Sequence, residues 1–178
     1  MSTRSDSVRV LSRALDQAGD VLARIRPEQL DDPTPCTDWT VGQLVDHLVA
    51  DPGNFVLMLH GEQPDWSSPP EEVRSGWTQR FRSAADDLVH AWHQLGETDI
   101  PISPDFMTAE FAAHTWDAAQ AIGLDTSLLD AEVAERGLAF VGDNLTADNR
   151  GPAFAPEREA GPDAGPYERL AAFTGRLT

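Results

Sequence analysis

Apolar residues recur with the period of an α-helix in every long patterned segment of this chain, and no such segment alternates with period two. The clearest stripe runs from Val73 to Leu95 and stops at Gly96, while an earlier stripe runs from Val8 to Ile25. A period of 3.6 places apolar side chains on one face of a helix, whereas a half-buried strand needs a period of two. The pattern therefore predicts an all-α fold.

The segment after residue 37 predicts a long second helix. Asp38 or Thr40 can cap its first turn, and the apolar phase continues across Pro52. We expect one helix that is kinked or locally broken near residues 51–53 and ends by Gly61. A Pro/Ser loop follows at 62–70, and Pro70 stands where prolines commonly open a helix, here the third.

The second half of the chain predicts shorter units. A fourth helix is expected over about Asp105–Ile122 and a fifth over about Ser127–Asn144. The segment 150–166 contains four prolines and should be irregular, and a short helix is expected at about Tyr167–Thr174. Together these elements predict a single domain, residues 1–178, built as a four-helix bundle with short additional C-terminal helices.

Charge and cysteine content narrow the class of partner. The 178 residues carry 30 acidic and 13 basic side chains, a formal charge of −17, which would repel nucleic acids and anionic lipid.

The sequence lacks a long apolar run, so we expect no signal peptide and no membrane span. Cys36 is the one cysteine, so no internal disulfide can form, which fits a reducing cytoplasm.

Glu110 and His114 stand four residues apart and therefore on one face of the fourth helix. In helical projection Asp117 lies in the same arc, and this arc borders the apolar stripe. Inward-facing polar groups need partners, and a metal ion is one such partner. His47, at the edge of the apolar arc of the second helix, is the best third ligand. Asp117 is expected beside this group as a neighbour instead of a ligand.

Two histidines and one carboxylate suit zinc best, and nickel or ferrous iron are alternatives. Three protein ligands leave a coordination position open for chemistry. The alternative reading of the same pattern is a solvated ion pair on a surface helix.

Several other candidates favour structural roles. His90 and His93 are expected at the surface of the third helix, and Cys36 is expected as a buried loop cysteine instead of a nucleophile. Trp39 and Trp116 are expected in the core, with the wall of a pocket as the alternative reading.

Three stretches carry a resemblance to a known family. PTPCTDWTVGQLVDHLVA resembles the second-helix signature of the DinB-like metal-binding superfamily, and more closely its actinobacterial branch related to the N-terminal domain of mycothiol-dependent maleylpyruvate isomerase. AEFAAHTWDAAQAIG resembles the fourth-helix motif of that branch, and the stretch from GPAFAP to YERLAAFTGR resembles its closing segment. The resemblance implies a bundle that holds a divalent metal, usually zinc, through His47, Glu110 and His114. It also implies that Asp117 is a catalytic residue next to the metal.

The resemblance implies a transferase or isomerase that uses a small thiol, mycothiol, to act on a small electrophilic substrate. The full isomerase has a further C-terminal domain that contributes to its thiol site, whereas this sequence ends at Thr178. The alternative is therefore a non-catalytic metal-binding module, either a sensor or a partner-binding bundle. Because bundles often pair through an exposed apolar face, a homodimer is a further expectation.

Overall fold

The computed structural model describes residues 3–36, 38–96, 98–150 and 154–177. Over these residues the protein is all-α, as predicted, and contains no β-strand. Its helices are α1 (Arg4–Leu22), α2 (Val41–Leu59), α3 (Trp77–Leu95), α4 (Pro104–Ala121), α5 (Ala131–Asn144) and α6 (Pro166–Phe173), with the short 3-10 helices η1 (Pro27–Gln29) and η2 (Thr126–Leu128). None of the described helices is long and apolar enough to cross a membrane.

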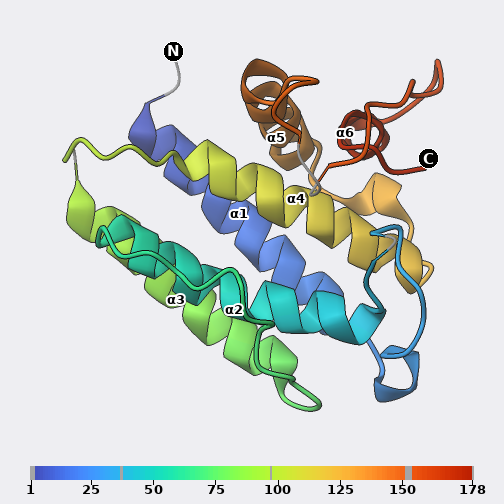
Figure 1. The fold of residues 1–178 in the computed structure, drawn as a ribbon, viewed down its shortest axis with the longest axis horizontal. Coiled ribbons are helices and arrows are strands. Elements are labelled where there is room, and N and C mark those ends of the chain that lie inside the picture. The colour runs from blue at the N-terminus through green and yellow to red at the C-terminus, as the bar shows by residue number, and fades with distance from the viewer. Residues whose placement is uncertain (1–2, 37, 97, 151–153, 178) are drawn as a thin grey trace.

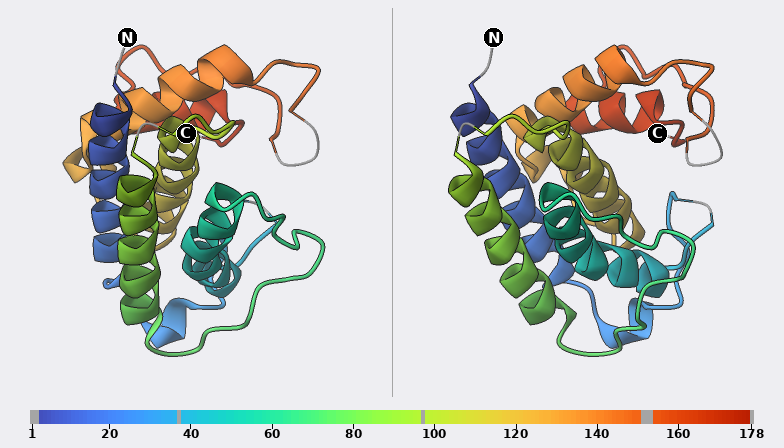
Figure 2. Two further views of the ribbon diagram at one scale, coloured as in Figure 1. Left: turned by 90° about the vertical axis from the view of Figure 1, so that its left-hand side faces the viewer. Right: turned by 60° about the vertical axis from the view of Figure 1, so that its left-hand side comes forward.

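The first four helices form the predicted bundle (Figure 1). α1 contacts α3 and α4, and α2 contacts the same two helices from the other side. Leu44, Phe81 and Phe111 are almost fully buried between them, and the rings of Phe81 and Phe111 meet edge to face, with centroids 6.0 Å apart. α5 and α6 lie together against α4, outside the four-helix core (Figure 2). They therefore add a second layer on one side of α4.

Local hydrogen bonds settle where α2 begins. Thr40, not Asp38, is its N-cap: the Thr40 hydroxyl accepts from the Gln43 backbone N–H, and the Gln43 side chain accepts from the Thr40 N–H. Such a capping box satisfies two donors that the first turn would leave unpaired. The helix continues through Pro52 to Leu59, although proline cannot donate a hydrogen bond to the preceding turn.

The prediction that α3 begins near Pro70 is wrong, because the helix begins at Trp77. Val73 is buried as predicted, but its backbone N–H donates to the Asp46 side chain at 2.7 Å and serves no helix. Gly76, with φ of 65°, then sets a left-handed N-cap that only glycine adopts without strain. Val73 therefore belongs to the segment before α3, although its position in the sequence is in phase with the apolar stripe of that helix.

The start of the fifth helix also differs from the expected Ser127. Residues Thr126–Leu128 form η2, and α5 begins only at Ala131, where Asp130 caps it by accepting from the Glu132 N–H. An N-cap residue has an extended backbone, so the cap at Asp130 prevents the helix from beginning earlier. The end at Asn144 agrees with the prediction.

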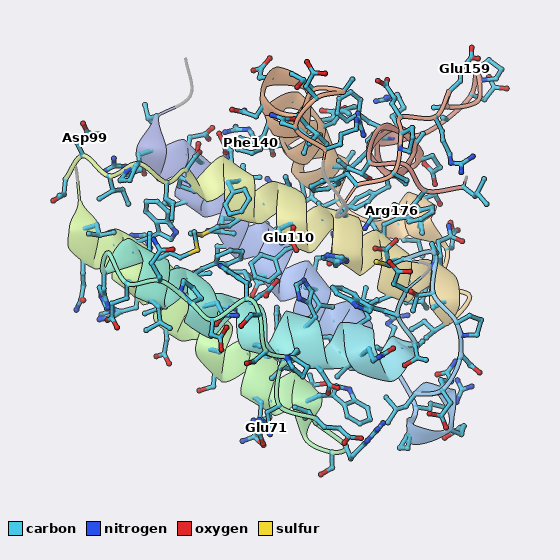
Figure 3. The ribbon with its side chains drawn as sticks, in the orientation of Figure 1. Glu71, Asp99, Glu110, Phe140, Glu159 and Arg176 are labelled. Carbon is cyan, nitrogen blue, oxygen red and sulfur yellow. The ribbon has the colours of Figure 1, made fainter. Side chains whose placement is uncertain are left out.

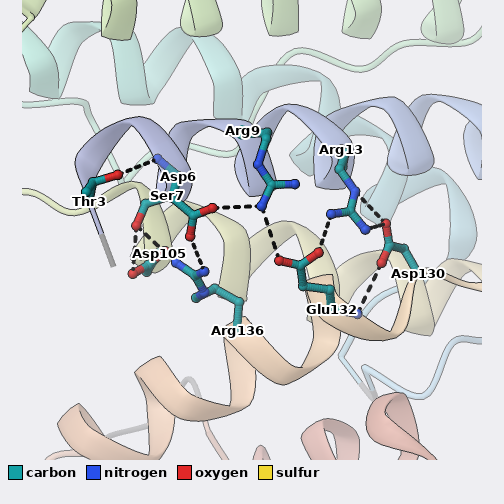
Figure 4. A network of polar contacts seen from close by, with 9 residues as sticks. All are labelled: Thr3, Asp6, Ser7, Arg9, Arg13, Asp105, Asp130, Glu132 and Arg136. Carbon is teal, nitrogen blue, oxygen red and sulfur yellow. Dashed lines mark hydrogen bonds and ion pairs between the residues drawn. The ribbon is translucent and has the colours of Figure 1, made fainter. Parts of the chain in front are cut away.

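A network of ion pairs ties α5 to α1 and α4 (Figure 4). Arg136 of α5 donates to Asp6 at 2.7 Å and to Asp105 at 3.3 Å. Arg9 and Arg13 of α1 reach the other end of the network, where Arg9 pairs with Asp6 and Glu132, and Arg13 pairs with Asp130 and Glu132. The network holds the outer layer in place beside α4.

Arg136→Ala is expected to lower the free energy of unfolding by about 1 kcal/mol, the upper end for partly exposed ion pairs. The reason is that one guanidinium links two helices of the core to α5. Urea denaturation in low and high salt measures the effect, which should shrink as salt screens the charges. Arg24→Ala, an exposed arginine of the turn after α1, is the matched control. Equal losses for both variants would contradict a specific role of the network.

Candidate metal centre

The predicted metal ligands meet between α2 and α4. His47 projects from α2, and Glu110 and His114 lie one turn apart on α4 (Figure 3 labels Glu110). Glu110 Oε1 lies 3.0 Å from His47 Nε2 and 3.1 Å from His114 Nε2. The three ligand atoms all lie within 4.8 Å of one another. The structure therefore brings together the three side chains that the sequence singled out, although His47 and Glu110 are 63 residues apart in the sequence.

These residues fit a divalent ion. Ligand atoms bonded to a tetrahedral zinc ion at roughly 2.0–2.2 Å lie roughly 3.3 Å apart, close to the separations found here. One carboxylate oxygen facing two imidazole nitrogens is also the donor set that zinc prefers. Only the pair of His47 with Glu110 has the geometry of a hydrogen bond, so the second imidazole nitrogen approaches Glu110 without one.

The charges of the cluster depend on one another. Burial acts to lower the pKa of His47, but the carboxylates of Asp51 and Glu110 outweigh it and raise that pKa to about 10. Burial likewise acts to raise the pKa of Glu110, but the imidazoles of His114 and His47 hold it well below its usual range. Protons and a divalent ion would thus satisfy the same carboxylate and imidazoles in turn.

Asp51 is a member of the cluster that sequence reasoning missed. It lies one turn after His47 and is 1% exposed, and its Oδ2 is 3.0 Å from His47 Nε2. This contact lacks hydrogen-bond geometry, and neither oxygen of the carboxylate has a hydrogen-bond partner among the described residues. The spacing of four from His47 was a signal, but the neighbouring Pro52 and Gly53 favoured a break in the helix at that point.

Asp117 lies behind His114, on the side away from Glu110. Its Oδ2 is 3.1 Å from His114 Nδ1, so Asp117 accepts the hydrogen bond that leaves Nε2 of His114 free to act as a ligand. Arg176 donates to both oxygens of Asp117, at 3.1 and 2.7 Å. Burial acts to raise the pKa of Asp117, but His114 and Arg176 lower it overall. The aspartate is therefore held as a charged, fully buried group.

Arg176 is the second residue that the sequence did not reveal. It follows α6, 59 residues from Asp117, and it is 8% exposed. The sequence around Arg176 contains no pattern that would indicate which carboxylate it pairs with. Its position is visible in Figure 3, on the side of α4 that faces α6.

A cavity of about 370 Å³ opens beside the three ligands. We call it the apolar cavity, because its walls are mainly hydrophobic side chains of α4, α5 and the segment that follows α5, among them Phe106, Phe140, Leu145 and Phe154. Cys36 and Arg176 add polar groups to its wall. The volume lies within the range of roughly 300–1,000 Å³ that small-molecule sites occupy.

Trp39 lines the apolar cavity beside the two imidazoles. Its ring centroid lies 4.6 Å from that of His47 and 5.4 Å from that of His114. Of the two readings for the tryptophans, the pocket wall applies to Trp39, whereas Trp116 is buried in the core. His90 and His93 are exposed on α3, as expected.

Cys36 is only half-buried, and burial raises the pKa of its thiol to about 11. Its sulfur lies within 4.8 Å of ligand atoms of His114 and Asp117, which makes a second group of potential ligands. We regard this group as the poorer one, because Asp117 already binds Arg176 and His114. The protonated thiol also lacks the charge that a metal ligand needs.

Comparisons with known proteins agree with this architecture. The mycothiol maleylpyruvate isomerase N-terminal domain family matches residues 11–119, which include all three candidate ligands and Asp117. Two uncharacterized proteins of Mycobacterium tuberculosis, from strains CDC 1551 / Oshkosh and ATCC 25618 / H37Rv, are each 31% identical over 187 residues, covering 96% of this chain and 98% of theirs. No solved structure matches the chain. The resemblance seen in the sequence is thus confirmed, and the chain belongs to the family of the mycothiol maleylpyruvate isomerase N-terminal domain.

Proposed function

We propose that the protein binds a divalent metal through His47, Glu110 and His114 and uses mycothiol to transfer a thiol to, or isomerise, a small electrophile. Zinc is the metal that the donor set favours, with nickel and ferrous iron as alternatives. The observation that carries the proposal is the convergence of the three ligand atoms at the wall of a cavity large enough for a substrate. The family supports mycothiol as the thiol.

A divalent ion at this site would stabilise a thiolate at neutral pH and so supply a nucleophile. The residues of the chain set the geometry for that chemistry. Asp117 fixes the tautomer of His114, because its Oδ2 accepts a hydrogen bond from the protonated Nδ1. Both oxygens of Asp117 are engaged by His114 and Arg176, which favours an orienting role over the transfer of a proton.

The apolar cavity is where we place the electrophile. Phe106 and Phe140 provide an apolar environment, and the ring of Trp39 packs against the His47 imidazole at the cavity wall. Exclusion of water protects a thiolate adduct from competing reactions and strengthens electrostatic effects in the site. Residues after position 119, beyond the family match, supply much of this wall.

A purified, zinc-loaded sample mixed with mycothiol and a panel of electrophiles tests the proposal. The panel should include a cis-configured unsaturated keto acid and a haloaromatic compound, so that isomerisation and transfer are both covered. We expect a rate above that of mycothiol alone for at least one member, and no such rate with metal-free protein. A rate equal to the uncatalysed one throughout the panel would refute the enzyme.

One observation favours a second candidate, a metal-binding module without turnover. The Asp51 Oδ2 lies 3.0 Å from His47 Nε2, so a further carboxylate stands next to one of the three candidate ligands. We infer that it would act as the fourth protein ligand in a closed site. Four protein ligands are typical of closed structural sites. The same electrophile panel separates the two candidates, because a closed site binds the metal and leaves every rate unchanged.

A further inference from the structure

A second cavity, of about 650 Å³, also reaches His47. It is formed between one face of α2 and the loop of residues 65–70, and we call it the loop cavity. Trp39 and His47 line both cavities. Of the three candidate ligands, His47 thus faces both cavities, while Glu110 and His114 line only the apolar cavity. Two cavities that meet at one candidate ligand offer separate places for two different molecules.

The wall of the loop cavity is polar, in contrast to that of the apolar cavity. Asn54 and Gln43 present side-chain amides to it from α2. The Gln43 carbonyl oxygen is engaged by the Thr40 N–H, which leaves its two amide protons for a ligand, and no described residue bonds the Asn54 amide. Asp46 uses only one of its two oxygens, on the Val73 N–H. These groups offer both donors and acceptors to a ligand.

A buried carboxylate also faces this cavity. Asp51 lines it, and the side chain has no hydrogen-bond partner for either oxygen among the described residues. Its Oδ2 contacts His47 Nε2 at 3.0 Å without hydrogen-bond geometry, so both oxygens can still accept a hydrogen bond. A buried acceptor without a hydrogen bond costs free energy, and a ligand group that donates one to it would be stabilised. Hydroxyl groups are such donors.

Trp66 gives the loop cavity an exposed aromatic wall. Its side chain is 56% exposed, although large apolar residues are usually buried in a bundle of this size. The loop around it is held in shape by Asp65, which accepts hydrogen bonds from the Ser67 backbone N–H and from the hydroxyls of Ser67 and Ser68. An indole kept exposed on an ordered turn provides a flat surface on which the apolar face of a ring can stack.

The charge of the cavity restricts the ligand further. Asp46, Asp51 and Asp65 line it, and no arginine does. Because the whole chain also has a net charge of −17, an anionic thiol would be repelled on approach. The favoured ligand is neutral, rich in hydroxyl donors, and contains a ring.

We propose that the loop cavity binds the sugar portion of a neutral, polyhydroxylated thiol through Trp66, Asn54 and Asp51, and directs its sulfur past His47 to the metal. This rests on the proposed function and deepens it, because it assigns thiol and electrophile to two separate cavities that meet at His47. Mycothiol is a thiol of this chemical class, with sugar and cyclitol hydroxyls, whereas glutathione is anionic and has no sugar.

Calorimetric titration of the zinc-loaded protein tests the assignment with three thiols: mycothiol, glutathione, and N-acetylcysteine amide, a neutral thiol without a sugar. We expect Trp66→Ala and Asn54→Ala each to weaken mycothiol binding by about tenfold, because the first removes a stacking surface and the second a hydrogen-bonding group. Affinity for N-acetylcysteine amide and the zinc content should stay unchanged. Leu128→Ala, which removes another exposed apolar side chain at η2, is the matched control.

The outcomes separate the two levels of the proposal. If wild-type protein binds zinc and mycothiol, but the Trp66 and Asn54 variants bind mycothiol as tightly as wild type, the loop cavity is not the sugar site and the proposed function stands. If wild-type protein binds glutathione as well as mycothiol, the charge argument fails and the assignment with it. If zinc-loaded wild type binds none of the three thiols, the proposed function itself is refuted.

Discussion

His114→Ala is expected to abolish stoichiometric binding of a divalent metal. The variant removes one of three ligands whose atoms lie within 4.8 Å of one another, and a two-ligand site holds zinc poorly. Loss of an outer-shell partner alone costs about 10–100-fold in metal affinity, so loss of a ligand should cost more. Elemental analysis after gel filtration, together with competition against a chromophoric chelator, measures stoichiometry and affinity.

His90→Ala is the matched control for this prediction. His90 is exposed on α3 and lies outside both groups of potential ligands. We expect His90→Ala to bind metal as wild type does, while His47→Ala and Glu110→Gln behave like His114→Ala. Full metal content in the His114 variant would show that the ion binds elsewhere in the protein. It would also exclude the second group of potential ligands, Cys36 and Asp117, because that group shares His114.

The convergence of the three candidate ligands could be predicted because two of them are local to one helix. A spacing of four fixes Glu110 and His114 on one face, whatever the rest of the fold does. His47 could be found because its helical phase places it at the edge of the apolar stripe of α2. In a four-helix bundle, that edge lies toward the same interior as the polar residues of α4. The helical periodicity thus predicted both the fold and the positions of the three candidate ligands.

The contributions of Asp51 and Arg176 could not be predicted, because each depends on tertiary contacts. Asp51 is aligned with His47 only because α2 continues through Pro52, where local propensity favours a break. Arg176 reaches Asp117 because α6 packs against α4, and no local pattern encodes which face of a short helix docks. The start of α3 was misjudged for a related reason, since the Asp46 side chain takes the Val73 N–H out of any helix.

Arg176→Ala is expected to destabilise the protein by about 3–5 kcal/mol, the cost of leaving one member of a buried ion pair uncompensated. Asp117 is 0% exposed, and Arg176 donates to both of its oxygens, so the variant would strand a buried carboxylate. Urea denaturation of metal-free protein measures this loss without interference from a bound ion. Arg169→Ala, an exposed arginine on α6, should change the stability by less than about 0.5 kcal/mol.

The double variant Arg176→Ala with Asp117→Asn separates the charge from the packing. Because the neutral amide no longer needs a cationic partner, we expect the double variant to be more stable than Arg176→Ala alone, which a double-mutant cycle would report as a coupling energy. The metal affinity of the double variant gives an independent readout. The neutral amide at position 117 is a weaker hydrogen-bond acceptor for His114 Nδ1–H than the charged carboxylate, so we expect the metal affinity to fall about 10–100-fold. If Arg176→Ala changes neither stability nor metal affinity, the arginine does not position Asp117. The segment after α5 would then serve the metal centre only as a wall of the apolar cavity.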